Sequence, residues 1–201
     1  MVAMRKCRNA AAIGRLTRIV MLGVLIIGPP SEAAACGYHD DVSLARGVLN
    51  WVYPDALHVV GAISTAVAER RLPAGVSMPG VLGLLGYHGT VRALDQHAQQ
   101  LRASSGEMPA PALSLLLIEP MLWTRFVSEG GDVRAQVHLS GPQAGDLVVI
   151  SGEEVIRAVA NNRLTVGEAY RSGLIRLYGT DEQVRSFLTL YDQVGKLRPT
   201  Q

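Results

Sequence analysis

The residues that could carry metal chemistry lie near the start of the chain, at Cys36 and His39. A thiolate and an imidazole three residues apart can bind zinc or copper, and a nearby carboxylate could complete the site. His58, His88 and His97 could add ligands from predicted helices. No second pair has metal-ligand spacing, and no Cys-x-x-Cys-His sequence for haem attachment occurs. A metal site at Cys36 and His39 is therefore a minor hypothesis.

The sequence patterns of hydrolases and of phosphate-binding loops do not occur. Ser64 lies in Ala-Ile-Ser-Thr-Ala and Ser140 in Leu-Ser-Gly, so neither forms the Gly-x-Ser-x-Gly of a nucleophile elbow. The stretch Gly80–Gly86 lacks the Gly-Lys-Ser/Thr that closes a phosphate-binding loop. His88, beside Tyr87, is the best lone candidate for acid–base chemistry, but a structural role for it is favoured. We expect a protein without enzymatic activity and without a cofactor.

The first 35 residues predict a cleavable secretory signal peptide. Five basic residues and no acidic one occur within the first 18 positions, and an unbroken apolar run follows at Ile19–Gly28. A run of that length is too short to span a bilayer, which needs about 20 residues, but it suits a signal. The small residues of Ser31–Ala35 then offer a cleavage site before Cys36. We expect an exported protein, periplasmic or secreted.

Cleavage before Cys36 raises the alternative of lipidation at that cysteine. Lipoprotein signals prefer leucine three residues before the cysteine, and Ala33 occupies that position here. Attachment to a membrane is expected only if Cys36 is lipidated, and an uncleaved membrane anchor is the remaining alternative. Cys7 would leave with the signal, so the mature chain could form no internal disulfide.

The charge of the mature chain argues against nucleic acid as a partner. The full chain of 201 residues has 19 Lys and Arg against 17 Asp and Glu, but five of the basic residues and only Glu32 belong to the signal. The remainder is slightly acidic and has no basic patch. About 166 residues, from a chain that is 48% hydrophobic, suffice for one domain with a full core.

Turn residues and periodicity divide the mature chain into a helical part and an α+β part. We expect a helical N-terminal extension over residues 36–105, an α+β region over 106–195 packed with it as one globular unit, and a tail at 196–201. Within the extension a glycine recurs every third residue, at Gly80, Gly83, Gly86 and Gly89. Each costs a helix about 1 kcal/mol relative to alanine, so close helix packing or a flat ligand should offset it.

The α+β region begins with four strand candidates joined by short connections, which predict an antiparallel meander. They are Leu113–Ile118, Met121–Val127, Val133–Leu139 and Asp146–Ile150. Ser151 with Glu154, and Thr165 with Glu168, have the spacing of capping boxes that begin helices. A further strand at Gly173–Gly179 and a closing amphipathic helix at Thr180–Tyr191 complete the chain.

Residues 146–190 resemble the C-terminal half of sterol carrier protein type 2 domains. The order of strand, capped helix, turn, short helix, strand and closing helix is similar, and Gly173–Gly179 (GLIRLYG) resembles a characteristic phrase of that family. The resemblance implies an α+β fold with a mainly antiparallel five-stranded sheet covered by helices. The helical, glycine-patterned extension departs from the family pattern.

The same resemblance implies an apolar tunnel between the sheet and the helices. The candidate lining residues are Trp51, Leu85, Leu117, Trp123, Phe126, Ile175, Phe187 and Leu188. The alternative is that these side chains form an ordinary core.

Two functions remain open. The first is non-enzymatic binding or transport of a hydrophobic small molecule, such as a lipid, a sterol-like compound or a quinone. The second is an accessory protein that docks on an exported redox or metal-dependent enzyme through Cys36–Asp55. A carrier needs an apolar volume of about 300 Å³ or more, whereas a docking protein would fill that space and expose an apolar patch instead.

Overall fold

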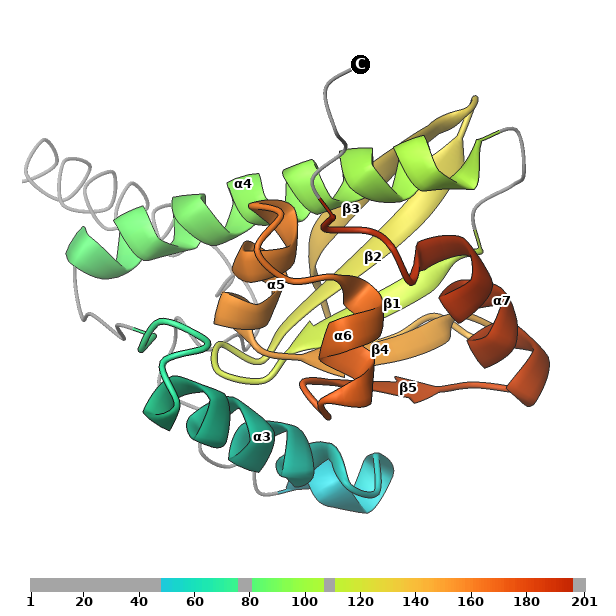
Figure 1. The fold of residues 1–201 in the computed structure, drawn as a ribbon. Coiled ribbons are helices and arrows are strands. Elements are labelled where there is room, and N and C mark those ends of the chain that lie inside the picture. The colour runs from blue at the N-terminus through green and yellow to red at the C-terminus, as the bar shows by residue number, and fades with distance from the viewer. Residues whose placement is uncertain (1–47, 76–80, 107–110, 197–201) are drawn as a thin grey trace, which may run out of the picture. The chain divides into compact units, whose positions relative to one another are not determined.

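The computed structural model describes residues 48–75, 81–106 and 111–196, with side chains from residue 86 onward in the second range. All of them belong to one compact unit, Ala34–Gln201. The candidate metal ligands Cys36 and His39 and the signal lie outside the described residues. The fold is α+β, as the sequence predicted, with one five-stranded sheet and helices against it (Figure 1).

The sheet is mixed, with strand order β3-β2-β1-β4-β5. Its strands are β1 (Leu113–Leu117), β2 (Leu122–Glu129), β3 (Asp132–Leu139), β4 (Leu147–Ser151) and β5 (Ile175–Tyr178). Adjacent strands are antiparallel except β1 and β4, which pair in parallel with Leu113 opposite Leu147.

The predicted four-strand antiparallel meander is therefore wrong at its fourth strand. The meander ends at β3, and residues 140–146 carry the chain back past β2 to the far side of β1. β1 and β4 are buried along their whole lengths, because both form the centre of the sheet and both faces are covered. A short connection suggested a hairpin, but the burial of two predominantly apolar strands at the centre of the sheet takes precedence over it.

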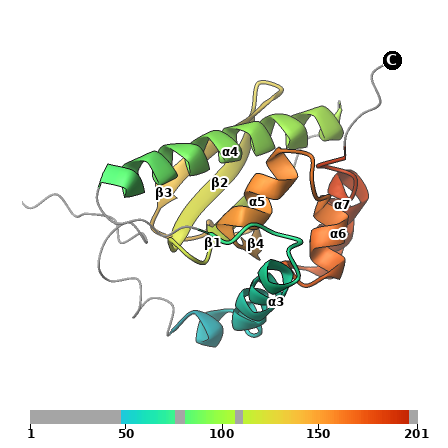
Figure 2. The ribbon, with the colours of Figure 1, turned by 60° about the vertical axis from the view of Figure 1, so that its left-hand side comes forward.

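One face of the sheet packs on four helices. They are α4 (Val81–Ser105), α5 (Glu153–Ala160), α6 (Val166–Arg171) and α7 (Asp181–Tyr191). α4 runs across β2 and β3, and α5, α6 and α7 lie on the same side of the sheet as α4 (Figures 1 and 2). We call the aliphatic cluster between this face and these helices the inner core; it includes Leu94, Leu101, Leu115, Phe126 and Tyr191.

The other face of the sheet packs on the first part of the N-terminal extension, residues 48–68, whereas α4, the last helix of that extension, lies on the inner face. A helical turn over residues 48–52 leads through a bend at 53–55 into α3 (Ala56–Ala68). Leu49, Ala56 and Val59 are buried against Leu116 and Ile150, which point away from the inner core. We call this cluster the outer core. The extension therefore supplies the layer that lets β1 and β4 be buried on both sides.

Helix α6 begins with the capping box that the sequence predicted. Thr165 Oγ1 accepts from the backbone N–H of Glu168, and a Glu168 carboxylate oxygen accepts from that of Thr165. The hydrogen bond from the Thr165 backbone N–H, together with one from the Thr165 side chain, lowers the pKa of Glu168. The closing helix α7 has the same box, made by Thr180 and Gln183.

The capping box predicted at Ser151 is wrong. Ser151 is the last residue of β4, and its hydroxyl donates to the carbonyl of Leu174. Gly152 takes the N-cap position of α5 without a side chain, and Glu119 Oε2 accepts from the backbone N–H of Glu153 at 2.9 Å. A carboxylate distant in sequence therefore replaces the local cap.

The described glycines of α4 lie where this helix packs on α5. Arg157 of α5 donates to the Gly86 carbonyl and the Thr90 hydroxyl, at 3.2 and 2.8 Å, and pairs with Glu153 at 3.1 Å. A Cβ added at Gly89 would lie 3.6 Å from the Arg157 guanidinium, at van der Waals contact, and one added at Gly86 would meet nothing within 4 Å. Neither glycine is therefore required for Arg157 to lie on the helix.

Candidate functional site

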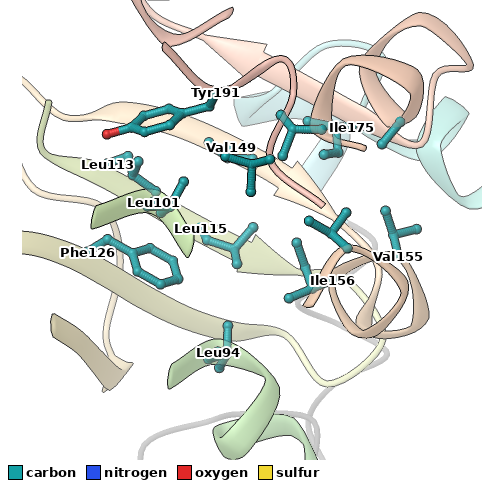
Figure 3. Close-up of a cluster of buried hydrophobic side chains, with 14 of the residues drawn as sticks. Leu94, Leu101, Leu113, Leu115, Phe126, Val149, Val155, Ile156, Ile175 and Tyr191 are labelled. Carbon is teal, nitrogen blue, oxygen red and sulfur yellow. The ribbon is translucent and has the colours of Figure 1, made fainter. Parts of the chain in front are cut away.

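Five of the eight predicted lining residues lie in the inner core or pack against it. Leu117, Phe126, Ile175 and Phe187 are all at most 3% exposed and belong to one cluster, against which Leu188 packs. Figure 3 shows Phe126, Leu115 and Ile175 among side chains of α4, α5 and the segment around Tyr191. Strand alternation explains the grouping, because Leu117 on β1 and Phe126 on β2 both point to the helix-covered face.

The other three predicted residues lie elsewhere. Trp123 points to the opposite face and packs in the outer core, and Trp51 is 88% exposed. The side chain of Leu85 lies outside the described part of α4. The structure thus divides the predicted set between an aliphatic interior, the second face of the sheet and the surface.

Two polar side chains are buried in the inner layer. Thr124 of β2 is fully buried and its Oγ1 has no partner, although it lies two residues from Phe126 on the same face. His97 of α4 is 5% exposed; its Nδ1 makes no hydrogen bond of normal geometry, and its side-chain partner is Gln100, one turn further along the helix. The His97 ring meets Phe126 edge-on, with ring centroids 5.7 Å apart. Phe126 therefore lies beside a buried imidazole and beside the Thr124 hydroxyl, which has no hydrogen-bond partner.

Burial keeps the imidazole of His97 neutral. Removal from water lowers the pKa of His97 to about 4, because a charged ring is poorly solvated there. A neutral imidazole has one donor and one acceptor nitrogen. Leaving a polar atom unpaired in an apolar interior costs about 1–3 kcal/mol. A buried polar atom that is left unpaired at this cost needs an explanation, and a bound molecule that supplies the missing hydrogen bond is one.

From the sequence, His97 was predicted only as a possible metal ligand, and Thr124 was not predicted to have any role. A signal for Thr124 existed, since it alternates with Leu122 and Phe126 and must share their inward face. For His97 the spacing to Leu94 and Leu101 on α4 indicated burial, because residues three and four apart share a helix face.

An aromatic cluster fastens the extension to the outer face of the sheet. The ring centroids of Tyr53 lie 6.0 Å from Trp123 and 5.1 Å from Tyr178. The Tyr178 hydroxyl donates to the Pro54 carbonyl at 2.6 Å. Burial raises the pKa of both tyrosines, so their hydroxyls stay protonated. The bend between the first helical turn and α3 is held in place by these contacts.

A half-buried ion pair marks the same outer face near the start of β4. Arg125 donates to both carboxylate oxygens of Asp146, at 2.7 and 2.9 Å, and Ser114 donates to the same carboxylate at 2.7 Å. The Asp146 side chain is 2% exposed. Every partner is paired within the chain, so the arrangement fixes β4 beside β1 and leaves no group for catalysis.

A groove of about 420 Å³ lies between α4 and the C-terminal turn after α7. Its lining is mixed, with about as much polar as apolar surface, and includes Gln96, Gln100, Asn162 and Lys196. The side-chain N–H groups of Gln96 and Gln100 donate to the Ala160 carbonyl at the end of α5. The groove is therefore chemically unlike the apolar tunnel that the resemblance implies.

Among the described residues, no group of three or more His, Cys, Asp or Glu side chains is arranged to hold a metal ion. In the same part of the chain, no helix has the length and apolar character needed to cross a membrane.

Comparisons with known proteins give likenesses of structure only. No protein-family model matches the chain, and no curated protein matches it. The UbiJ-SCP2 ubiquinone synthesis protein is similar at 19% identity over 59% of this chain and 96% of its own, with a TM-score of 0.34. Sterol Carrier Protein 2 Like 2 from Aedes aegypti is similar at 18% identity over 49% of this chain and 96% of its own, with a TM-score of 0.36.

A sec-alkylsulfatase from Pseudomonas is also similar, at 17% identity over 54% of this chain, with a TM-score of 0.34. This chain spans only 17% of that enzyme's length. Two of the three similar structures carry the name of the sterol carrier family that residues 146–190 resemble. We base the function below on the chain's own geometry.

Proposed function

We propose that this chain is an exported, non-enzymatic protein that binds or transports a hydrophobic small molecule carrying one hydrogen-bonding group. A lipid, a sterol-like compound or a quinone has this chemistry. The site is the inner core around Phe126, between β2 and α4. Export rests on the predicted signal at residues 1–35, and the absence of catalytic sequence patterns supports a binding role.

The observation that carries the proposal is the unpartnered Thr124 Oγ1 beside Phe126, with the buried imidazole of His97 edge-on to the same ring. Binding sites for small molecules are mostly apolar with a few polar groups that orient the ligand. Leu94, Leu101 and Leu115 supply the apolar surroundings, each at most 1% exposed. A ligand with a hydroxyl, carbonyl or carboxyl group would satisfy the Thr124 hydroxyl and place its apolar part among the leucines.

Because side chains fill the inner core, a ligand must displace some of them. α4 is the element that would have to move, and its movement would break the hydrogen bonds from Gln96 and Gln100 to the Ala160 carbonyl and from Arg157 to the Gly86 carbonyl. Movement of α4 from β2 would open the space beside Phe126 and bring Thr124 and His97 to its wall. The ligand would then take the place that the leucines of α4 occupy.

The second candidate, a docking protein, is favoured by a different observation. Trp51 and Val52 lie within Cys36–Asp55 and are 88% and 65% exposed. A filled interior with an exposed apolar patch is the pattern expected of a docking protein. The two candidates differ in whether the inner core binds a probe.

The test is fluorescence titration with two probes of different polarity. Cis-parinaric acid is an apolar chain with a carboxyl group, and diphenylhexatriene is apolar without one. We expect both to bind, and Thr124→Val to weaken cis-parinaric acid about five- to tenfold while leaving diphenylhexatriene unchanged, since only the acid uses the hydroxyl.

The matched control is Ser186→Val on the exposed surface of α7, which should change neither affinity. Failure of both probes to bind the wild-type protein would refute the carrier and favour docking. Equal loss of both probes in Thr124→Val would refute the polar anchoring at that residue.

A further inference from the structure

The N-terminal extension presents an apolar surface that nothing in the described chain covers. Five large aliphatic or aromatic side chains over residues 48–60 are at least 40% exposed. They are Val48 at 53%, Trp51 at 88%, Val52 at 65%, Leu57 at 46% and Val60 at 40%. We call them the extension face. Single exposed apolar residues are ordinary, but a group of this size marks an interaction surface.

The extension face is nearly free of charge. Residues 48–68 contain no lysine or arginine, and their only ionisable side chains are Tyr53, Asp55 and His58. Asp55 and His58 are close to each other, with a carboxylate oxygen 3.5 Å from the ring Nδ1. Depletion of charge is typical of the centre of a protein interface and least typical of free surface. The surface offers no attraction to a highly charged partner.

Small residues continue this face along α3. Leu57, Gly61, Ser64 and Ala68 follow the three- and four-residue spacing of one helix face, and all are exposed. A Cβ added at Gly61 would meet nothing within 4 Å. The Ser64 hydroxyl donates to the Val60 carbonyl of its own helix at 2.9 Å, so it needs no water partner. A second helix could therefore approach α3 closely without stranding a polar group.

We infer that the extension face binds a second copy of this chain, with α3 of each copy crossing α3 of the other about a two-fold axis. A two-fold interface brings the same patch against itself, so it requires a patch that does not repel its own copy. The extension face meets this requirement, because its apolar residues face apolar residues and Asp55 can pair with His58 of either copy.

The exposed area is of the right order for such a dimer. At the measured exposures, the five side chains present on the order of 500 Å² per copy, with Trp51 the largest contributor. Two copies would bury on the order of 1,000 Å², near the lower limit for a specific interface. The dimer should therefore be reversible, with dissociation in the micromolar range.

Sedimentation velocity over about 1–100 μM of the protein isolated after export tests the inference. We expect the wild-type protein to move from monomer to dimer, and Val60→Arg to stay monomeric, because two arginines would meet across the axis. Ser186→Arg on exposed α7 is the control and should dimerise like the wild type. A wild-type monomer throughout the range, or a dimer that Val60→Arg leaves intact, would overturn the inference.

Cysteine cross-linking locates the interface without disturbing its charge. In a chain with Cys7 and Cys36 replaced by serine, Gly61→Cys should form an intermolecular disulfide under mild oxidation, and Ser186→Cys should not. Equal cross-linking at both positions would contradict the inference. So would binding of the monomer to phosphatidylcholine vesicles through Trp51, which would assign the face to a membrane. Neither experiment depends on ligand binding, so the two proposals can fail separately.

Discussion

Thr124 places a hydroxyl without a hydrogen-bond partner in the apolar interior of the protein. Its hydroxyl is fully buried and unpaired on the face of β2 that also bears Leu122 and Phe126. A residue kept for packing alone would be served as well by valine, which has almost the same shape. We therefore expect the unpaired hydroxyl to reduce the stability of the ligand-free protein.

This reasoning predicts that Thr124→Val leaves the ligand-free protein as stable as the wild type, or stabilises it by up to about 1 kcal/mol, because an unpaired buried hydroxyl is removed. Urea unfolding followed by circular dichroism measures the change. A loss of more than about 1 kcal/mol would show that Thr124 has a structural partner and would weaken its assignment to the ligand.

His97 predicts how stability depends on pH. Its pKa is about 4 in the folded protein and near 6.5 when unfolded, so between these values the unfolded chain binds more protons. Stability should therefore fall as the pH falls through this window. The contribution of His97 between pH 7 and pH 5 is about 2 kcal/mol, and it levels off below pH 4.

The measurement is the urea unfolding free energy at pH 7 and pH 5 for the wild type and His97→Leu. The variant should lose about 2 kcal/mol less than the wild type on acidification. His58→Leu serves as the control, since His58 is exposed. The same loss in wild type and His97→Leu would mean that His97 is accessible to water.

At the scale of single elements, the start of α5 shows what local sequence cannot reveal. Ser151 and Glu154 have the spacing of a capping box, but Ser151 belongs to a buried central strand and its hydroxyl is used by Leu174. The N-terminus of α5 is satisfied from 34 positions earlier, by Glu119. Glu154 is free of the cap, and its pKa is raised mainly by burial.

Replacing Glu119 by alanine should destabilise the fold by about 1 kcal/mol, the usual cost of a lost cap. Glu119→Gln should cost less, because an amide oxygen can still accept from Glu153. Thermal or urea unfolding measures both losses of stability. Thr165→Ala, which removes the local N-cap of α6, gives the loss expected for an ordinary cap, with which they can be compared. If Glu119→Ala is as stable as the wild type, the long-range cap contributes nothing.

The elements that the sequence predicted well are those defined by local pattern. The alternation in Val133–Leu139 gave β3, and the spacing of Thr165 with Glu168 gave the start of α6. The position of β4 was missed, because pairing in parallel with β1 is a contact between distant segments. No local pattern distinguishes a strand that continues a meander from one that crosses to the sheet's other half.

At the scale of the whole molecule, both faces of the sheet are covered, one by α4 to α7 and the other by residues 48–68. Three helices of the inner core, α5, α6 and α7, were predicted after residue 146, whereas the fourth, α4, belongs to the extension and was not expected on this face. The role of the extension as the cover of the outer face could not be foreseen, because packing depends on Leu116 and Ile150 pointing away from the inner core. Trp51 was expected in a pocket and lies on the surface.

The apolar residues of the candidate site could be predicted from the sequence, whereas its polar atoms could not. Apolar residues such as Leu117 and Phe126 were identified as a set by their type, and the structure brings them together. The Thr124 hydroxyl becomes notable only when the surrounding partners are known to be missing. Sequence shows which groups can donate or accept a hydrogen bond, whereas only the fold shows which of them remain unpaired.

Native mass spectrometry of the protein purified from the envelope of the cells that make it, followed by solvent extraction, shows whether the inner core holds a ligand. We expect one hydrophobic adduct per chain, with an oxygen-bearing group, on a polypeptide that begins at Cys36. A bare polypeptide mass, with no hydrophobic compound in the extract, would contradict the claim that the inner core binds a ligand.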